Sequence, residues 1–225
     1  MKKIIAIVAA AAALAVVAAL IYVVPGFIAP FGKKGAFDAR GNPQVVLFTA
    51  KECNAACGQV VRDLTARKVE FQQVMLDGNP EKEKRYREMG GGGSVPYLVA
   101  GRYAVSGYER APIASALAQT YGDKYLTRAE LNYYANHFRA DGSPLVYMYG
   151  ASWCSYCKTL RAELKKRKID YVEVDVELAP DSDAMVRTLE ITGYPTTYVG
   201  YQRVPDGDTI GPVLAAMGRA GKRRL

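Results

Sequence analysis

Four cysteines form two close pairs in this chain of 225 residues. Cys154 and Cys157 are separated by two residues, and Cys53 and Cys57 by three. Thiols this close can form and open a disulfide, so disulfide exchange is the first chemistry they suggest. Half of a zinc site is the alternative for Cys154 and Cys157, but the sequence lacks a second pair at zinc-ligand spacing. We therefore expect a redox site at Cys154 and Cys157, with no metal.

Three predicted elements surround this pair. The apolar run 145–149 predicts a short buried strand, and the alternating residues 169–176 predict a second strand. Between them, Leu160 and Leu164 lie at helical spacing, which predicts a helix from about residue 155 to residue 168. The pair therefore sits where a strand leads into a helix.

This position favours a reactive thiol. Cys154 would lie at the first turn of the helix, where unpaired backbone N–H groups and the helix dipole lower the pKa of a thiol. Cys157 would lie one turn further along the same face, close enough to close the disulfide and release the partner. Downstream, residues 193–196 place Pro195 before an apolar run, which suits a cis peptide bond. Such a turn would leave backbone groups free to pair with an extended substrate beside the sulfurs.

Residues 144 to about 218 resemble a glutaredoxin, within the thioredoxin fold. The resemblance rests on the Trp-Cys-Ser-Tyr-Cys motif at 153–157 and on the Tyr-Pro-Thr turn at 194–196. It implies Cys154 as the nucleophile, Cys157 as the resolving thiol and Pro195 as a cis proline. The residues expected to contact substrate are Trp153, Tyr156, Tyr194, Pro195 and Thr196.

One departure concerns glutathione. Glutaredoxins usually carry a Gly-Gly-Ser/Thr-Asp run after the last strand, which holds a carboxylate of glutathione. The corresponding residues 204–211 contain acidic residues and glycines in a different order. The expected partners are protein disulfides or glutathione mixed disulfides; we expect no cofactor, with glutathione only as a thiol partner.

An internal repeat predicts the architecture. A shift of 100 residues aligns identical residues in the two halves without a gap, and Pro96 corresponds to Pro195 at a shift of 99. The sequence therefore predicts an α/β chain of two tandem thioredoxin-like, glutaredoxin-like domains, each a central mixed sheet flanked by helices. The identical pairs include Val46 and Val146, Cys57 and Cys157, Leu64 and Leu164, Arg67 and Arg167, and Val74 and Val174.

The first copy differs at the cysteines. Asn54 takes the place of Cys154, and Cys53 lies opposite Trp153. Cys53 and Cys57, with Pro96 beside them, are a possible second dithiol with an altered redox potential. A structural disulfide and a soft-metal site for Cu(I) remain open as alternatives.

The N-terminus predicts export. Residues 4–24 carry no charge and follow Met1-Lys2-Lys3, so they are long enough to span a bilayer with the N-terminus in the cytoplasm. A cleaved signal peptide is the alternative. We expect a single-pass inner-membrane protein whose domains are periplasmic or otherwise extracytoplasmic, or a periplasmic protein after cleavage.

The predicted organisation follows from these features. Thr127 and Glu130 form a capping box for a linker helix that contains the lone His137, which we expect to be solvated or hydrogen-bonded rather than catalytic. The net charge is +8, but without a nucleic-acid-binding fold the basic C-terminus is expected to be a solvated end. The predicted segments are an anchor or signal (1–25), a linker (26–43), a first domain (44–121), a linker helix (122–143), a second domain (144–220) and a basic tail (221–225).

Together these features predict a thiol–disulfide oxidoreductase of the cell envelope. Its Cys154/Cys157 dithiol would exchange disulfides with a protein or a low-molecular-weight thiol. Two alternatives belong to other classes: a module that binds a [2Fe–2S] cluster or copper, and a thioredoxin-fold adaptor without catalysis.

Overall fold

The computed structural model describes residues 35–224. The anchor or signal predicted at 1–25 and the first part of the predicted linker lie outside these residues. Within 35–224, no helix is both long enough and apolar enough to cross a membrane.

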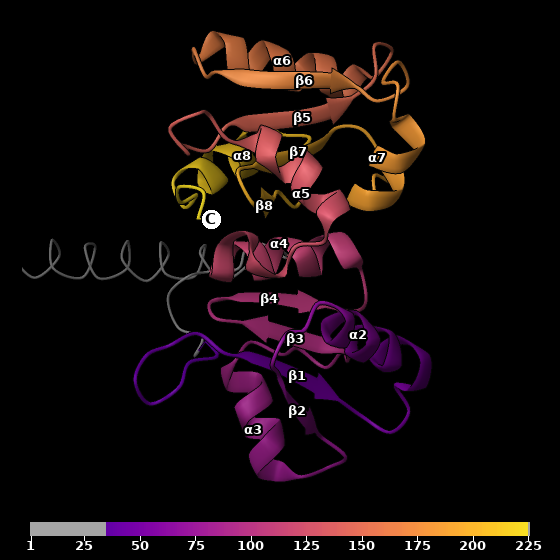
Figure 1. The fold of residues 1–225 in the computed structure, drawn as a ribbon, viewed down its shortest axis with the longest axis vertical. Coiled ribbons are helices and arrows are strands. Elements are labelled where there is room, and N and C mark those ends of the chain that lie inside the picture. The colour runs from indigo at the N-terminus through magenta and orange to yellow at the C-terminus, as the bar shows by residue number, and fades with distance from the viewer. Residues whose placement is uncertain (1–34, 225) are drawn as a thin grey trace, which may run out of the picture. The chain divides into compact units, whose positions relative to one another are not determined.

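The first half of the described chain alternates strands and helices (Figure 1). Its elements are β1 (Val45–Thr49), α2 (Asn54–Ala66), β2 (Gln72–Met75), α3 (Pro80–Glu88), β3 (Tyr97–Ala100), β4 (Tyr103–Ser106) and α4 (Arg110–Tyr121).

The second half repeats this order after a short connection. The connection contains η1 (Gly122–Tyr125), α5 (Arg128–Tyr134) and η2 (Ala135–His137). The repeated elements are β5 (Val146–Gly150), α6 (Ser155–Lys166), β6 (Tyr171–Asp175), α7 (Ser182–Leu189), β7 (Thr196–Val199), β8 (Gln202–Arg203) and α8 (Ile210–Met217).

Each half builds a four-stranded mixed sheet. The strand orders are β2-β1-β3-β4 and β6-β5-β7-β8, with the first pair parallel and the other two pairs antiparallel in both sheets. The repeat extends to the backbone, because Lys68 and Lys168 both have positive φ, 58° and 55°, and both Pro96 and Pro195 follow cis peptide bonds. The architecture is consistent with two thioredoxin-like domains.

The central strands are buried on both faces. All five residues of β1 and all five of β5 are buried. Helices cover both sheets, so these strands are continuous hydrophobic runs rather than alternating ones. In the second half, Leu160 and Leu164 of α6 pack into the same core cluster as Met148 of β5 and both cysteines of the pair.

Helix α4 differs from the surface helices because it is buried almost all round. It contacts β3 and β4 of its own half and also α7 and β8 of the second half. The hydroxyl of Ser115 donates to the carbonyl of Tyr201 at 2.8 Å and accepts the N–H of Arg203 at 3.0 Å. A helix that contacts elements of both halves is expected to carry apolar residues on most of its faces.

The connection is tied to the first half by charge. The predicted capping box of Thr127 and Glu130 is present. Glu130 also accepts two hydrogen bonds from the guanidinium of Arg67, the C-cap residue of α2, at 2.7 and 2.6 Å. Arg67 and Glu130 are 3% and 5% exposed, so this is a buried ion pair.

The C-terminal residues 221–224, expected to be a solvated end, are largely exposed but also hydrogen-bonded to the rest of the chain. Arg223 pairs with Asp123 at 2.8 Å, and the carbonyl of Arg224 accepts the N–H of Asp123 at 3.0 Å and the hydroxyl of Tyr201 at 3.1 Å. A Cβ on Gly122 would lie 2.3 Å from the Arg224 carbonyl oxygen, so glycine is required for this approach. Asp123 and Tyr201, which are distant in the sequence, therefore hold the end of the chain in place.

Candidate redox site

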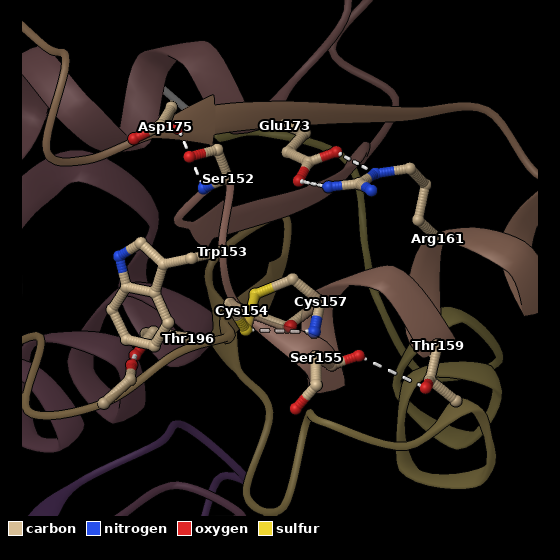
Figure 2. Close-up of a disulfide and its surroundings, with 12 residues drawn as sticks. Ser152, Trp153, Cys154, Ser155, Cys157, Thr159, Arg161, Glu173, Asp175 and Thr196 are labelled. Atoms are coloured by element: carbon tan, nitrogen blue, oxygen red, sulfur yellow. Dashed lines mark hydrogen bonds and ion pairs between the residues drawn. A yellow bond between two sulfur atoms is a disulfide. The ribbon is translucent and has the colours of Figure 1, made fainter.

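The Cys154–Cys157 pair lies where strand β5 leads into helix α6. The structure joins the two cysteines in a disulfide with Cα atoms 5.3 Å apart. Cys154 is the N-cap of α6, and its sulfur accepts the backbone N–H of Cys157 at 3.0 Å (Figure 2). A hydrogen bond from a helix N–H favours a negatively charged sulfur, so this geometry stabilises the Cys154 thiolate when the disulfide opens.

Exposure differs sharply between the cysteines and their neighbours. Cys154 and Cys157 are 2% and 0% exposed, whereas Trp153 and Tyr156 are 64% and 62% exposed. The aromatic residues flank Cys154 in the sequence and project into solvent. A partner that reaches the Cys154 sulfur must therefore approach beside two large aromatic side chains.

Trp153 is held in place by the segment that follows β6. Its indole N–H donates to Glu177 at 2.9 Å. Its ring also packs edge to face on Tyr194, with centroids 5.9 Å apart. The adjacent N–H of Ser152 donates to Asp175 at 2.9 Å. Two carboxylates therefore fix the loop that presents the disulfide.

The predicted turn at 194–196 lies beside this loop. The Tyr194–Pro195 bond is cis, and the hydroxyl of Thr196 donates to the carbonyl of Gly193 at 2.9 Å. Burial and the charges of Glu177 and Asp175 raise the pKa of Tyr194. The structure thus brings Trp153 and Tyr194 into contact, while Tyr156 lies on the first turn of α6. The roles of these residues in substrate contact stay predictions.

Sequence reasoning missed an ion pair behind the disulfide. Arg161 of α6 and Glu173 of β6 form a bidentate pair, with Nε–Oε2 at 2.7 Å (Figure 2). A Cβ on Gly150 would lie 2.9 Å from the Cys157 sulfur and 3.8 Å from a Glu173 carboxylate oxygen, so the glycine makes room for the sulfur beside this pair. The alternation of residues 169–176 could have indicated this, because it places Glu173 on strand β6, where Glu173 is in register with the buried Met148 of β5.

Asp175 and Glu177 were also missed. Asp175 is the last residue of β6, and Glu177 lies two residues after it. Nothing in the local sequence indicates that their carboxylates accept hydrogen bonds from Ser152 and Trp153, which lie 23 and 24 residues earlier in the chain.

The first cysteine pair also closes a disulfide, although three residues separate its members. Cys53 and Cys57 have Cα atoms 5.5 Å apart, and the nearby Val95–Pro96 bond is cis. Cys53 precedes α2, and Cys57 donates its N–H to the Cys53 carbonyl at 3.0 Å. The Cys53 side chain accepts no capping hydrogen bond. The first pair therefore forms a disulfide as the second pair does, but its N-terminal sulfur accepts no helix N–H.

His137 is a structural residue, as expected for a hydrogen-bonded histidine. It is fully buried, with Nδ1 3.1 Å from the Gly200 carbonyl and Nε2 2.8 Å from the Tyr149 hydroxyl. Because a carbonyl only accepts, Nδ1 carries the proton and Nε2 accepts from Tyr149. Burial lowers the pKa of His137 to about 3. The core cluster around Tyr149 is separate from the one that contains the cysteines.

Comparison with known proteins gives a family match for the second half. The glutaredoxin family model matches residues 145–204. None of the curated proteins matches the chain.

Several solved structures are similar to parts of the chain. A glutaredoxin from wheat is 15% identical, covers 40% of this chain and 93% of its own, and has a TM-score of 0.31. A glutaredoxin from Archaeoglobus fulgidus is 21% identical, covers 37% and 98%, and has a TM-score of 0.31. The AhpF component of the alkylhydroperoxide reductase from Enterococcus faecalis is 16% identical, covers 80% and 90%, and has a TM-score of 0.32.

The family match covers strand β5, the cysteine pair, helix α6 and the cis-proline turn. These are the elements that hold the Cys154–Cys157 disulfide. Residues 145–204 therefore form a domain that matches the glutaredoxin family model.

Proposed function

We propose that this protein is a thiol–disulfide oxidoreductase whose working dithiol is Cys154 and Cys157. The observation that carries the proposal is the hydrogen bond from the Cys157 N–H to the Cys154 sulfur at the start of α6. It supports Cys154 as the nucleophile, because only a thiolate attacks a disulfide. The position of Cys157 one turn along α6, in disulfide reach of Cys154, supports its role as the resolving thiol.

The reaction has two exchange steps. The Cys154 thiolate attacks one sulfur of the partner disulfide, forms a mixed disulfide and releases the other partner sulfur as a thiolate. Cys157 then loses its proton and attacks the Cys154 sulfur, which releases the second partner thiol. The protein dithiol is oxidised to the disulfide, and the partner disulfide is reduced to two thiols. Run backwards, the same steps oxidise a dithiol.

The partners in this proposal are protein disulfides or glutathione mixed disulfides. We place the reaction in the cell envelope, with residues 4–24 as a membrane anchor or an export signal, because a charge-free run of this length after two lysines is typical of both. Cys53 and Cys57 are proposed as a second, weaker dithiol, supported by their closed disulfide and the adjacent Pro96 turn.

The test compares the two nucleophile positions in the full chain. Reduced protein is mixed with the disulfide of insulin, and separately with a peptide–glutathione mixed disulfide, and thiol release is measured. We expect Cys154→Ser to lower both rates at least a hundredfold, and the matched variant Cys53→Ser to lower them less than about threefold, because a serine oxygen cannot attack a disulfide. Unchanged activity in Cys154→Ser would overturn the proposal.

A further inference from the structure

Two large exposed side chains, Trp153 and Tyr156, lie within the cysteine motif of the candidate site. Leu178 is 79% exposed and directly follows Glu177, which holds Trp153. With Trp153 and Tyr156, it is among the most exposed large hydrophobic residues of the described chain. We call these three residues the collar. Large exposed apolar groups at one site mark an interaction surface, and tryptophan and tyrosine are common energetic anchors of such surfaces.

One collar residue, Leu178, lies in a strongly acidic stretch of this basic protein. Residues 169–186 contain six acidic residues and no lysine or arginine, although the whole chain has a net charge of +8. Three of these acids are paired with arginines: Asp170 with Arg139, Glu173 with Arg161 and Asp183 with Arg187.

Asp175 and Glu177 are different. Their carboxylates accept N–H groups of Ser152, Glu177 and Trp153, and neither forms an ion pair within residues 35–224. These two negative charges therefore remain without a counter-ion beside the collar, so the surface is complementary to a cation.

Further acidic residues follow the proline turn. The loop after β8 contains Asp206 and Asp208, and residues 204–218 carry no lysine or arginine. This loop is joined to β7, because the hydroxyl of Thr197 donates to the carbonyl of Gly207 at 2.7 Å. On helix α6 the exposed Lys158 follows one turn after Cys154, whereas the negative charge of Glu177 lies on the Trp153 side of the site.

We propose that the surface around the Cys154–Cys157 disulfide selects an extended protein segment that carries an apolar residue and a lysine or arginine close to its cysteine. The apolar residue packs on the collar, and the basic residue pairs with Glu177. An anionic thiol such as glutathione, with two carboxylates and one ammonium group, is disfavoured by the same charges. This inference rests on the proposed function and adds the class of substrate.

The test uses matched peptides and the full-length reduced protein. Three peptides have phenylalanine before one cysteine and differ only in flanking residues, which are lysine, glutamine or glutamate. Each is supplied as a mixed disulfide with 2-mercaptoethanol, and the reaction is quenched with acid and quantified by chromatography. At low salt we expect the lysine peptide to react about tenfold faster than the glutamate peptide, with the glutamine peptide between them, because opposite charges attract more strongly at low ionic strength.

Two variants assign the charge effect. Glu177→Gln removes the charge and retains an oxygen that can accept the indole N–H, so we expect the ratio of lysine to glutamate rates to fall to about threefold. Asp170→Asn is the matched control, because it removes the same charge from the opposite end of β6, where Asp170 pairs with Arg139. It should leave the ratio unchanged.

A second pair assigns the apolar contact. Leu178→Ser should slow the phenylalanine peptides about threefold, relative to a peptide with glycine in that position. Leu214→Ser is the control, because Leu214 of α8 is 40% exposed and lies outside the collar.

The outcomes separate this inference from the proposed function. If all three peptides react equally fast, or if the glutamate peptide and glutathione mixed disulfides react fastest, the substrate class is wrong and the oxidoreductase remains. If none reacts and insulin is not reduced, both proposals fall.

Discussion

The two cysteine pairs of this chain occupy equivalent places in two similar sheets, but their surroundings differ. Both pairs close disulfides at the start of a helix, and each half contains one cis proline. The first cysteine of each pair is the N-cap of its helix, but only the Cys154 sulfur accepts a helix N–H, and the Cys53 sulfur accepts no such bond. One extra residue between the cysteines therefore preserves the disulfide and removes the interaction that favours a reactive thiolate.

The halves also differ in where they hold their charges. Arg67 and Arg167 are equivalent in the repeat, and each pairs with the acidic residue four positions earlier, Asp63 or Glu163. Only Arg67 also pairs with Glu130 of the connection, and its side chain is 3% exposed, whereas that of Arg167 is 38% exposed. The first half thus uses a buried ion pair for attachment to α5, whereas the ion pair of Arg167 stays within the second half. The two halves therefore share a fold and differ in how their charged side chains are paired.

The largest expected effect distinguishes Cys157 from Cys57, the second cysteine of each pair. Cys157→Ser should trap the mixed disulfide on Cys154 and lower the reduction of protein disulfides at least a hundredfold, because no thiol remains to attack it. Mass spectrometry of the quenched reaction would show the trapped adduct. Cys57→Ser is the matched variant and should neither trap a partner nor lose more than about threefold in rate. Equal trapping by both variants would make the halves equivalent.

The second prediction concerns the two equivalent arginines. Arg67→Met should lower the free energy of unfolding by about 3 kcal/mol, because Glu130 is left as a buried charge without its partner. Arg167→Met should cost less than about 1 kcal/mol, as is usual for an exposed pair. Urea unfolding at pH 7 measures both. Similar losses in the two variants would contradict the structural difference between the halves.

The third prediction uses the single histidine, which belongs to the connection. An unfolded histidine has a pKa of about 6.5, whereas burial lowers the pKa of folded His137 to about 3. Below pH 6.5 the unfolded chain therefore binds a proton that the folded chain does not. The contribution of His137 to the free energy of unfolding is thus fully present above pH 6.5 and is lost as the pH falls towards 3.

Between pH 7 and pH 5 the free energy of unfolding, measured with urea, should fall by about 2 kcal/mol. The variant His137→Gln should show little change over this interval. A wild-type stability that stays flat between pH 7 and pH 5 would contradict the buried neutral histidine.

The smallest expected effect compares the reactivity of the two first cysteines. In the reduced protein, Cys154 should be alkylated by iodoacetamide with a midpoint about one pH unit below that of Cys53, because a helix N–H stabilises only the Cys154 thiolate. Peptide mass spectrometry across a pH series would resolve the two sites. The same midpoint for both cysteines would remove the chemical difference between the halves.

Much of the second site could be predicted from local sequence. The strand before the motif, the helix after it and the cis proline follow from apolar runs, helical spacing and the place of Pro195. The repeat at a shift of 100 predicted two similar sheets, and their strand orders agree. These features are encoded locally because spacing and backbone preference act over a few residues.

Other features were decided only by the tertiary structure. Asp175 and Glu177 hold the loop before Cys154, Arg67 is buried although its counterpart Arg167 is not, and Arg223 pairs with Asp123 across 100 residues. The sequence determined which segments are strands, helices and thiol positions in this protein. Which charges meet, and which surface surrounds the disulfide, depends on packing between distant segments, because a polar side chain finds its partner only after the sheets and helices are in place.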